Sequence, residues 1–121
     1  MSEALYYKSA CELSEALERK ELSSVELTTA IIERTKAVEA RIGAFNSYDE
    51  SDALQQAKAS DARRASRASR GPLDGIPVGI KDVLAVKGQP LTCSSWMLEK
   101  FVSPYDATCI QKLKSAGAVL W

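Results

Sequence analysis

Lys81 and Asp82 are the residues whose types and position suggest chemistry, because they follow the apolar run Ile76–Ile80 at the point where it ends. A lysine at the end of a buried strand loses hydration, which disfavours its charged ammonium form. A neutral amine there could accept a proton and serve as the general base that activates a serine hydroxyl, as in Ser-Lys variants of the serine triad. The alternative is that Lys81 pairs with a nearby carboxylate or extends into solvent. Composition and periodicity alone favour this alternative.

The other polar side chains near this run carry weaker signals. Asp82 either orients Lys81 by hydrogen bonding or ends the strand in an Asx-type turn, and the turn is the preferred interpretation. Ser94 and Ser95 lie outside any Gly-rich segment, so we assign them no catalytic role. Cys93 has no basic residue or histidine close by in the sequence that would favour a thiolate, and we expect it to be unreactive.

The composition narrows the classes of function. The chain has the length of one domain, 121 residues, with 16 acidic side chains, 16 basic ones and no histidine. Balanced charge predicts no overall attraction to nucleic acid, and the absent histidine rules out a Ser-His or Cys-His dyad within the chain. An odd number of cysteines without a Cys-x-x-Cys pair gives little support to a disulfide framework or a zinc site. We interpret all three as buried or incidental thiols: Cys11, Cys93 and Cys109.

The N-terminal stretch MSEALYYKSACELSEALERKEL has scattered charges and no long apolar run. We therefore expect neither a signal peptide nor a membrane-spanning helix there, and we expect a cytoplasmic location.

Two apolar runs in the second half of the chain predict strands. Ile76–Ile80 shows no alternation, which is typical of a strand covered on both faces in a parallel sheet, provided that Pro77 lies at its start. Ala118–Trp121 predicts a second buried strand. Residues 76–121 would then form one βαβ-like unit with a right-handed crossover.

The segment between the two strands carries turn and helix signals. Residues 87–90 predict a turn, and residues 94–100 predict a helical turn. Asp106 is expected to cap a helix that Gly117 ends. One side of that helix carries Cys109, Ile110 and Leu113.

The first half of the chain reads as helical. Ser9 with Glu12 and Ser23 with Glu26 have the spacing of capping boxes, and they predict a helix that ends near residue 20 and a longer one that Gly43 ends. The longer helix is expected to bury one apolar face, formed by Leu27, Ile31, Val38 and Ile42.

A third helix is predicted from about residue 52 to residue 69, after a short extended piece at residues 44–48. Leu54 is its one large apolar residue, so we expect the helix to bury little and to lie on the surface. Its basic side chains form a local positive face: Lys58, Arg63, Arg64, Arg67 and Arg70.

The stretch GPLDGIPVGIKDVLAVKGQPLTCSSWMLEKFVSPYDATCIQKLKSAGAVL, residues 71–120, resembles the opening of the amidase signature family. GIPVGIKD is similar to amidases in general. The longer run KGQPLTCSSWMLEKFVSPYDATCIQKL resembles in particular the glutaminase subunits of aspartyl/glutamyl-tRNA amidotransferases within that family, and LxxxELSSVELT in the first two helices agrees more loosely.

This resemblance implies an α/β fold in which a mixed sheet lies between helices. The chain would be the N-terminal part of a single amidase domain, with a helical region at residues 1–70 and the start of the α/β core at residues 71–121. It also implies amide hydrolysis by a Ser, cis-Ser, Lys triad, in which the matching lysine, Lys81, relays a proton through the cis-serine to the nucleophilic serine.

The narrower resemblance implies a glutaminase that releases ammonia from glutamine. Two partners, the B and C subunits, would complete a heterotrimer that uses ATP and Mg²⁺ to convert Glu-tRNA(Gln) or Asp-tRNA(Asn) to Gln-tRNA(Gln) or Asn-tRNA(Asn). The tRNA would bind mainly through the partner, and no cofactor, metal or membrane contact is expected for this chain.

The family's Gly/Ser-rich segment, which carries both serines, has no counterpart in the sequence. We therefore expect a piece of a longer protein that is inactive alone, and open strand edges that make it aggregation-prone. Asp74 and Val83 depart from the family pattern beside the lysine without removing it.

Two alternatives stay open. One is a piece of a stand-alone amidase that hydrolyses small amides. The other is a non-catalytic RNA-binding or scaffold module that uses the basic helix at residues 58–70. Because residues 51–70 contain no aromatic residue, a solvated helix is the preferred interpretation of that stretch.

Overall fold

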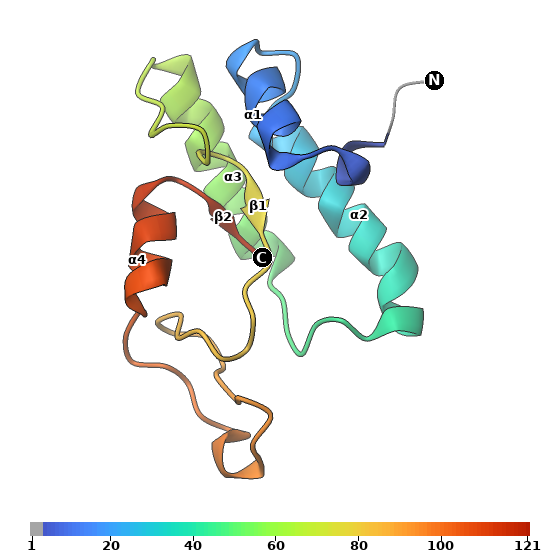
Figure 1. The fold of residues 1–121 in the computed structure, drawn as a ribbon, viewed down its shortest axis with the longest axis vertical. Helices are drawn as coiled ribbons and strands as arrows, with labels where there is room; N and C mark the ends of the chain where they lie inside the picture. The colour runs from blue at the N-terminus through green and yellow to red at the C-terminus, as the bar shows by residue number, and fades with distance from the viewer. Residues whose placement is uncertain (1–3) are drawn as a thin grey trace.

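The computed structural model describes residues 4–121, in which helices predominate and two short strands form a parallel sheet (Figure 1). Residues 1–3 lie outside the described part. The elements in chain order are η1 (Leu5–Tyr7), α1 (Ala10–Glu18), α2 (Ser24–Ile42), α3 (Glu50–Ala65), β1 (Pro77–Val78), η2 (Trp96–Leu98), α4 (Thr108–Ser115) and β2 (Val119–Leu120).

Two predicted capping boxes begin α1 and α2. The Ser9 hydroxyl accepts a hydrogen bond from the Glu12 amide, and the Glu12 carboxylate accepts one from the Ser9 amide; Ser23 and Glu26 repeat the arrangement. Gly43 ends α2 with a left-handed φ of 59°. These contacts satisfy backbone groups that a helix end leaves unpaired, so both predicted helices are confirmed.

The predicted parallel strands are also confirmed. Val119 N donates to Ile76 O, Trp121 N donates to Val78 O, and Ile80 N donates to Trp121 O, each at 2.9 Å. The ladder therefore runs slightly beyond β1 and β2 at both ends. Pro77 is the first residue of β1, a position where its missing N–H removes no ladder hydrogen bond.

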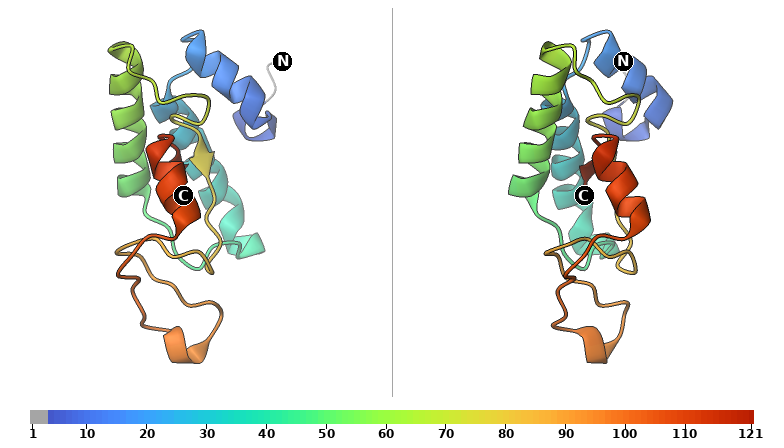
Figure 2. Two further views of the ribbon diagram at one scale, coloured as in Figure 1. Left: turned by 60° about the vertical axis from the view of Figure 1, so that its left-hand side comes forward. Right: turned by 90° about the vertical axis from the view of Figure 1, so that its left-hand side faces the viewer.

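The two residues of β2 face opposite layers of the molecule. Val119 packs with Ala53 and Ala57 of α3 and with Val25 of α2, whereas Leu120 packs with Ile110 of α4. This follows from the alternation of side chains along a strand. Figure 2 shows the α2–α3 pair and α4 on opposite sides of the strands.

The third helix has an exposed side, as expected for a helix on the surface, but the prediction that it buries little is wrong. This helix, α3, packs along α2, and its residues Ala53, Ala57 and Ser60 are fully buried. Small residues spaced by three and four positions let the α3 backbone approach its neighbours closely, which a search for large apolar side chains misses. The helix also ends at Ala65, four residues before the predicted end.

Two predictions about helices need correction. Leu27 is buried and Ile31 packs beside it, as predicted. Thr28, Ile32 and Thr35 are buried as well and Ile42 is 61% exposed, so the buried face is only partly the predicted one. Helix α4 begins after Ala107, and no side chain caps it. Asp106 instead accepts hydrogen bonds from the Lys87 amide and the Lys114 ammonium, both at 2.8 Å.

Residues 44–48 form no strand. The three cysteine thiols are free and exposed, which contradicts the prediction of buried thiols and fits the incidental alternative: Cys11, Cys93 and Cys109.

An arm formed by residues 88–105 projects from the body of the molecule (Figures 1 and 2). Backbone hydrogen bonds hold its base, from Gly88 N to Ser103 O at 2.8 Å, and from Leu91 N to Phe101 O and Ser103 N to Gln89 O, each at 3.0 Å. Trp96 and Met97 at its tip are 87% and 94% exposed. None of the helices between residues 4 and 121 has the length and apolar character needed to span a bilayer.

Candidate functional site

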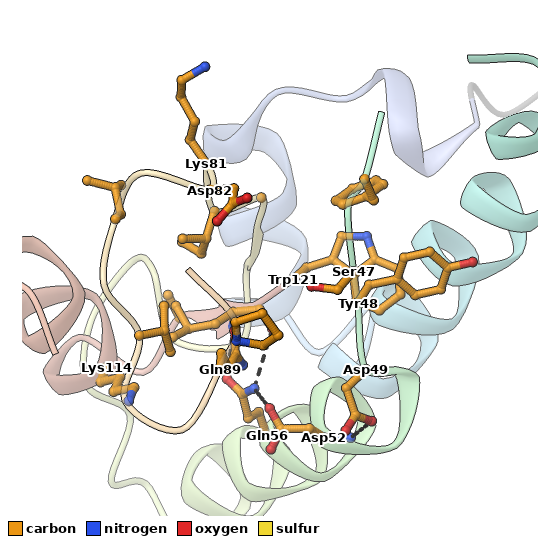
Figure 3. Close-up of a pocket in the computed structure, with 18 of the residues that line it drawn as sticks. Ser47, Tyr48, Asp49, Asp52, Gln56, Lys81, Asp82, Gln89, Lys114 and Trp121 are labelled. Carbon is orange, nitrogen blue, oxygen red and sulfur yellow. Dashed lines mark hydrogen bonds between the residues drawn. The ribbon is translucent and has the colours of Figure 1, made fainter. Parts of the chain in front are cut away.

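A cleft of about 1110 Å³ opens at the carboxyl ends of β1 and β2 and extends along β2 as far as Gly117. Residues 79–90 form one wall, residues 44–49 form another, and Gln56 and Trp121 contribute side chains between them (Figure 3). In α/β proteins, ligands bind outside the carboxyl ends of parallel strands, because loops there can present side chains without disturbing the sheet. This cleft is therefore the candidate site.

Lys81 lies on this cleft, in the turn that follows the β1 ladder. Its carbonyl accepts hydrogen bonds from Val83 N at 2.8 Å and from Leu84 N at 3.0 Å, so its backbone is fixed. Its side chain is exposed and extends away from Gln56 and Asp52 (Figure 3). The expected loss of hydration is thus not seen in this chain, because the ladder ends at Ile80 and no layer covers the next residue.

Asp82 does not pair with Lys81 and does not form the expected Asx-type turn. Its carboxylate accepts hydrogen bonds from the Thr92 amide at 2.7 Å, from the Thr92 hydroxyl and from the Asn46 side-chain amide at 2.9 Å. Partial burial acts to raise the pKa of Asp82, but these donors outweigh it and hold the pKa below its usual value. Asp82 is therefore an ionised acceptor that joins three segments of the cleft.

The turn held by Asp82 has an unusual backbone. Cys93 and Ser94 adopt left-handed φ values of 49° and 57°, which residues with a side chain rarely do. Cys93 N donates to Asp82 O at 3.0 Å, and Ser95 N donates to Thr92 O at 2.9 Å. Such conformations persist only where surrounding contacts over-determine them.

Three aromatic rings lie together on the other side of the cleft. The ring of Trp121 lies beside that of Tyr48 (Figure 3), with 5.0 Å between the centroids. The centroid of the Phe45 ring lies 5.8 Å from that of Trp121. This cluster was not predicted, because Phe45 and Tyr48 were assigned to an extended piece and Trp121 only to a strand.

Gln56 covers the outer edge of β2. Its Oε1 accepts from Leu120 N at 2.8 Å, and its Nε2 lies 3.4 Å from Leu120 O and 2.6 Å from Asp52 Oδ2. A side-chain amide can pair with a strand as a peptide group does. The outer edge of β2 is consequently not open at Leu120, in contrast to the expectation of free strand edges.

The opposite end of β1 contains a buried ion pair that was not predicted either. Asp74 is fully buried, and Arg63 Nη2 donates to its Oδ1 at 2.5 Å while the Arg70 amide donates to its Oδ2 at 2.9 Å. Burial acts to raise the pKa of Asp74, but these hydrogen bonds hold it below its usual value. The signal available in the sequence was an aspartate directly before Gly75 and β1.

The predicted basic face of α3 is largely engaged within the molecule. Arg63 pairs with Asp74, Arg64 lies 3.1 Å from Glu18 and donates to Asp74 O, and Arg70 donates to Lys114 O. Arg64 is mostly buried, with an 11% exposed side chain. Between residues 4 and 121 no cluster of three or more potential metal ligands is found.

Comparisons with known proteins agree with this architecture. The sequence profile of the Amidase family matches residues 26–121. The glutamyl-tRNA(Gln) amidotransferase A subunit of Moorella thermoacetica is 50% identical over 116 residues, and that of a Roseiflexus species is 49% identical over the same length. Each match covers 96% of this chain and 24% of the relative, so the chain spans about a quarter of the curated relatives it matches.

Solved structures show the same arrangement. The native peptide amidase from Stenotrophomonas maltophilia matches with a TM-score of 0.87 and 31% identity, over 94% of this chain and 24% of that one. A fatty acid amide hydrolase at 22% identity has a TM-score of 0.88, which supports the fold alone.

Proposed function

Because the chain belongs to the amidase family, we propose that it forms the lysine-bearing part of a glutamine-hydrolysing amidase, with Lys81 as general base. The observation that supports this most is the place of Lys81 at the carboxyl end of β1, on the wall of the cleft, in a turn fixed by backbone hydrogen bonds. A base must be held in a defined position relative to the hydroxyl that it deprotonates.

In the proposed reaction, the serines come from polypeptide outside residues 4–121. Neutral Lys81 takes a proton from the bridging serine, which takes one from the nucleophilic serine as its oxygen attacks the carboxamide carbon of glutamine. The C–N bond breaks, ammonia leaves with the returned proton, and water hydrolyses the acyl ester to glutamate. Packing of that polypeptide over the exposed Lys81 amine would remove its water and favour its neutral form.

The relatives that match this chain support a proposal for the reaction that consumes the ammonia. The amidotransferase relatives match this chain at about half of its positions, so we propose the same class of reaction: amidation of Glu-tRNA(Gln) or Asp-tRNA(Asn) with ATP in a cytoplasmic complex with B and C subunits. Arg63 and Arg64 of α3, and Arg70 beyond its end, are engaged in internal contacts, which favours tRNA binding through a partner over binding through this basic stretch.

A graft tests the proposal. Residues 1–121 would replace the matching quarter of the Moorella thermoacetica protein, and ammonia release from glutamine would be measured in the assembled complex with its partners. We expect activity within about tenfold of the unmodified complex, and loss of at least about 10³-fold on Lys81→Ala. Lys100→Ala, an exposed lysine on the arm, is the matched control and should leave the rate unchanged. Ammonia release that survives Lys81→Ala would refute the assignment.

The stand-alone amidase stays the second candidate, because a solved peptide amidase shares the fold. Because most of that graft comes from the recipient, a second graft of residues 1–121 into the Stenotrophomonas maltophilia peptide amidase distinguishes the two. A larger share of the parent's activity in the peptide amidase graft would favour the second candidate, whereas a larger share in the amidotransferase graft would favour the first.

A further inference from the structure

We infer that Asp82 is a positioning residue that fixes the backbone beside Lys81 by holding two separate loops, residues 44–48 and 92–95. This inference rests on the proposed function, because it concerns how the base of that reaction is held.

The contacts of Asp82 reach far along the chain. Its Oδ1 accepts from Thr92 N at 2.7 Å, and its Oδ2 accepts from the Thr92 hydroxyl and from Asn46 Nδ2. Its backbone carbonyl accepts from Cys93 N at 3.0 Å. A residue that only ended the strand would bond to groups two or three positions away, whereas these partners lie 10 and 36 positions away.

Lys81 lies between two fixed points. On one side, Ile80 N is bonded to Trp121 O, the last hydrogen bond of the sheet; on the other side is Asp82 with its four contacts. The backbone of Lys81 is thus held while its side chain remains free. In a catalytic site, a displacement of about 1 Å can reduce the rate about 100-fold.

The strained turn next to Asp82 supports the same interpretation. Cys93 and Ser94 both have left-handed backbones, and the contacts of Thr92 with Asp82 are what hold the turn in this form. Strain that is maintained by a hydrogen-bond network is found where local geometry matters for function.

The network also argues against a direct electrostatic role. Both carboxylate oxygens are occupied by uncharged donors, and Lys81 makes no ion pair in the described part of the chain. Asp82 therefore acts through hydrogen-bond geometry. An asparagine at this position keeps one acceptor for Thr92, and the Asn46 amide can rotate to accept from the new amide group.

The experiment uses the same grafted complex and measures kcat, KM for glutamine and the melting temperature. Asp82→Ala should lower kcat about 100-fold with KM changed less than about threefold. Asp82→Asn should recover at least about tenfold of that loss. Thr92→Val removes the hydroxyl with almost no change in shape and should lower kcat about tenfold, whereas Thr92→Ser keeps the hydroxyl and should recover most of the rate.

The outcomes separate the inference from the proposed function. If the unmodified graft is active and Lys81→Ala abolishes activity, but Asp82→Ala lowers only the melting temperature and leaves kcat unchanged, then Asp82 is merely structural and the inference fails. If Asp82→Asn is as damaging as Asp82→Ala, the charge rather than the geometry is needed, and the inference also fails. An inactive unmodified graft would instead count against the proposed function.

Discussion

The two ends of β1 are each held by an aspartate, but by opposite means. Before the strand, Asp74 is fully buried and is bonded to the Arg63 guanidinium and the Arg70 amide. After the strand, Asp82 is partly exposed on the cleft and is bonded only to uncharged donors from Thr92 and Asn46.

This difference separates stability from function along a single strand. A charged pair without water around its carboxylate is costly to break, because the remaining charge stays buried. Hydrogen bonds at the edge of a cleft can be replaced by water at modest cost, so their loss should disturb the loops they hold more than the fold as a whole. The contacts of Asp74, before β1, should therefore determine the stability of the fold. The contacts of Asp82, after β1, should determine the local geometry around Lys81.

The largest effect is expected from Arg63→Ala. The substitution leaves the Asp74 carboxylate buried without its charged partner, which should lower the free energy of unfolding by about 3–5 kcal/mol. Urea unfolding of the 121-residue chain, followed by circular dichroism, measures this. Arg67→Ala, a neighbouring arginine in an exposed position, is the control and should change stability by less than about 0.5 kcal/mol. If Arg63→Ala and Arg67→Ala lowered the free energy of unfolding equally, the proposed difference between the two ends of β1 would be refuted.

Gly75, next to Asp74, should be nearly as sensitive. It has a φ of 84°, and a Cβ there would lie 2.5 Å from Ser60 Oγ and 2.8 Å from the Ser24 side chain. Gly75→Ala should combine about 1–3 kcal/mol of overpacking with about 1–2 kcal/mol of backbone strain. Gly43→Ala is the matched control, because Gly43 has a φ of 59° and no atom lies within 4 Å of the position that its Cβ would take. The Gly43→Ala control measures the cost of backbone strain without overpacking. The Gly75→Ala chain should therefore unfold at a clearly lower urea concentration than the Gly43→Ala chain.

The sequence predicted the parts of this fold that depend on local rules. Capping pairs such as Ser23 with Glu26, the left-handed Gly43 and the parallel run around Pro77 each follow from backbone chemistry within a few residues. The position of Lys81 after the first strand was predicted for the same reason.

The sequence did not predict contacts between distant segments. The Arg63–Asp74 pair, the Gln56 amide on the edge of β2 and the bond from Asn46 to Asp82 join residues 11 to 64 positions apart. Polar side chains have no periodicity that reveals their partners, and the burial of α3 depended on small residues rather than large ones. The exposure of Lys81 depended on where the sheet ends, which a run of apolar residues locates only approximately.

Acid should weaken the contacts of the buried Asp74 carboxylate, which precedes β1. The pKa of Asp74 is lower in the folded chain than its unfolded value, so its stabilising contribution is complete above the unfolded pKa and is lost as the pH falls through the folded one. The free energy of unfolding should therefore begin to fall below about pH 5, as the pH nears the unfolded pKa of an aspartate, and should continue to fall as the pH is lowered further. The difference in free energy of unfolding between the wild-type chain and Asp74→Asn should shrink as the pH falls through this range. A difference that is independent of pH would show that the charge of Asp74 does not contribute.

The smallest change in global stability is expected at the cleft, from Asp82→Ala. Because the carboxylate is partly exposed and its donors can bond to water, the free energy of unfolding should fall by only about 1 kcal/mol. Its local effect should be larger. In amide hydrogen exchange, the Thr92 amide loses its acceptor, and the Cys93 amide keeps the backbone carbonyl of residue 82 as acceptor but lies in the turn that is released. Both should exchange at least about tenfold faster, while the Val119 amide in the sheet should show only the change expected from global stability. Uniform acceleration of all three amides would mean that Asp82 supports the whole fold, as Asp74 does, and the two ends of β1 would then not differ in kind.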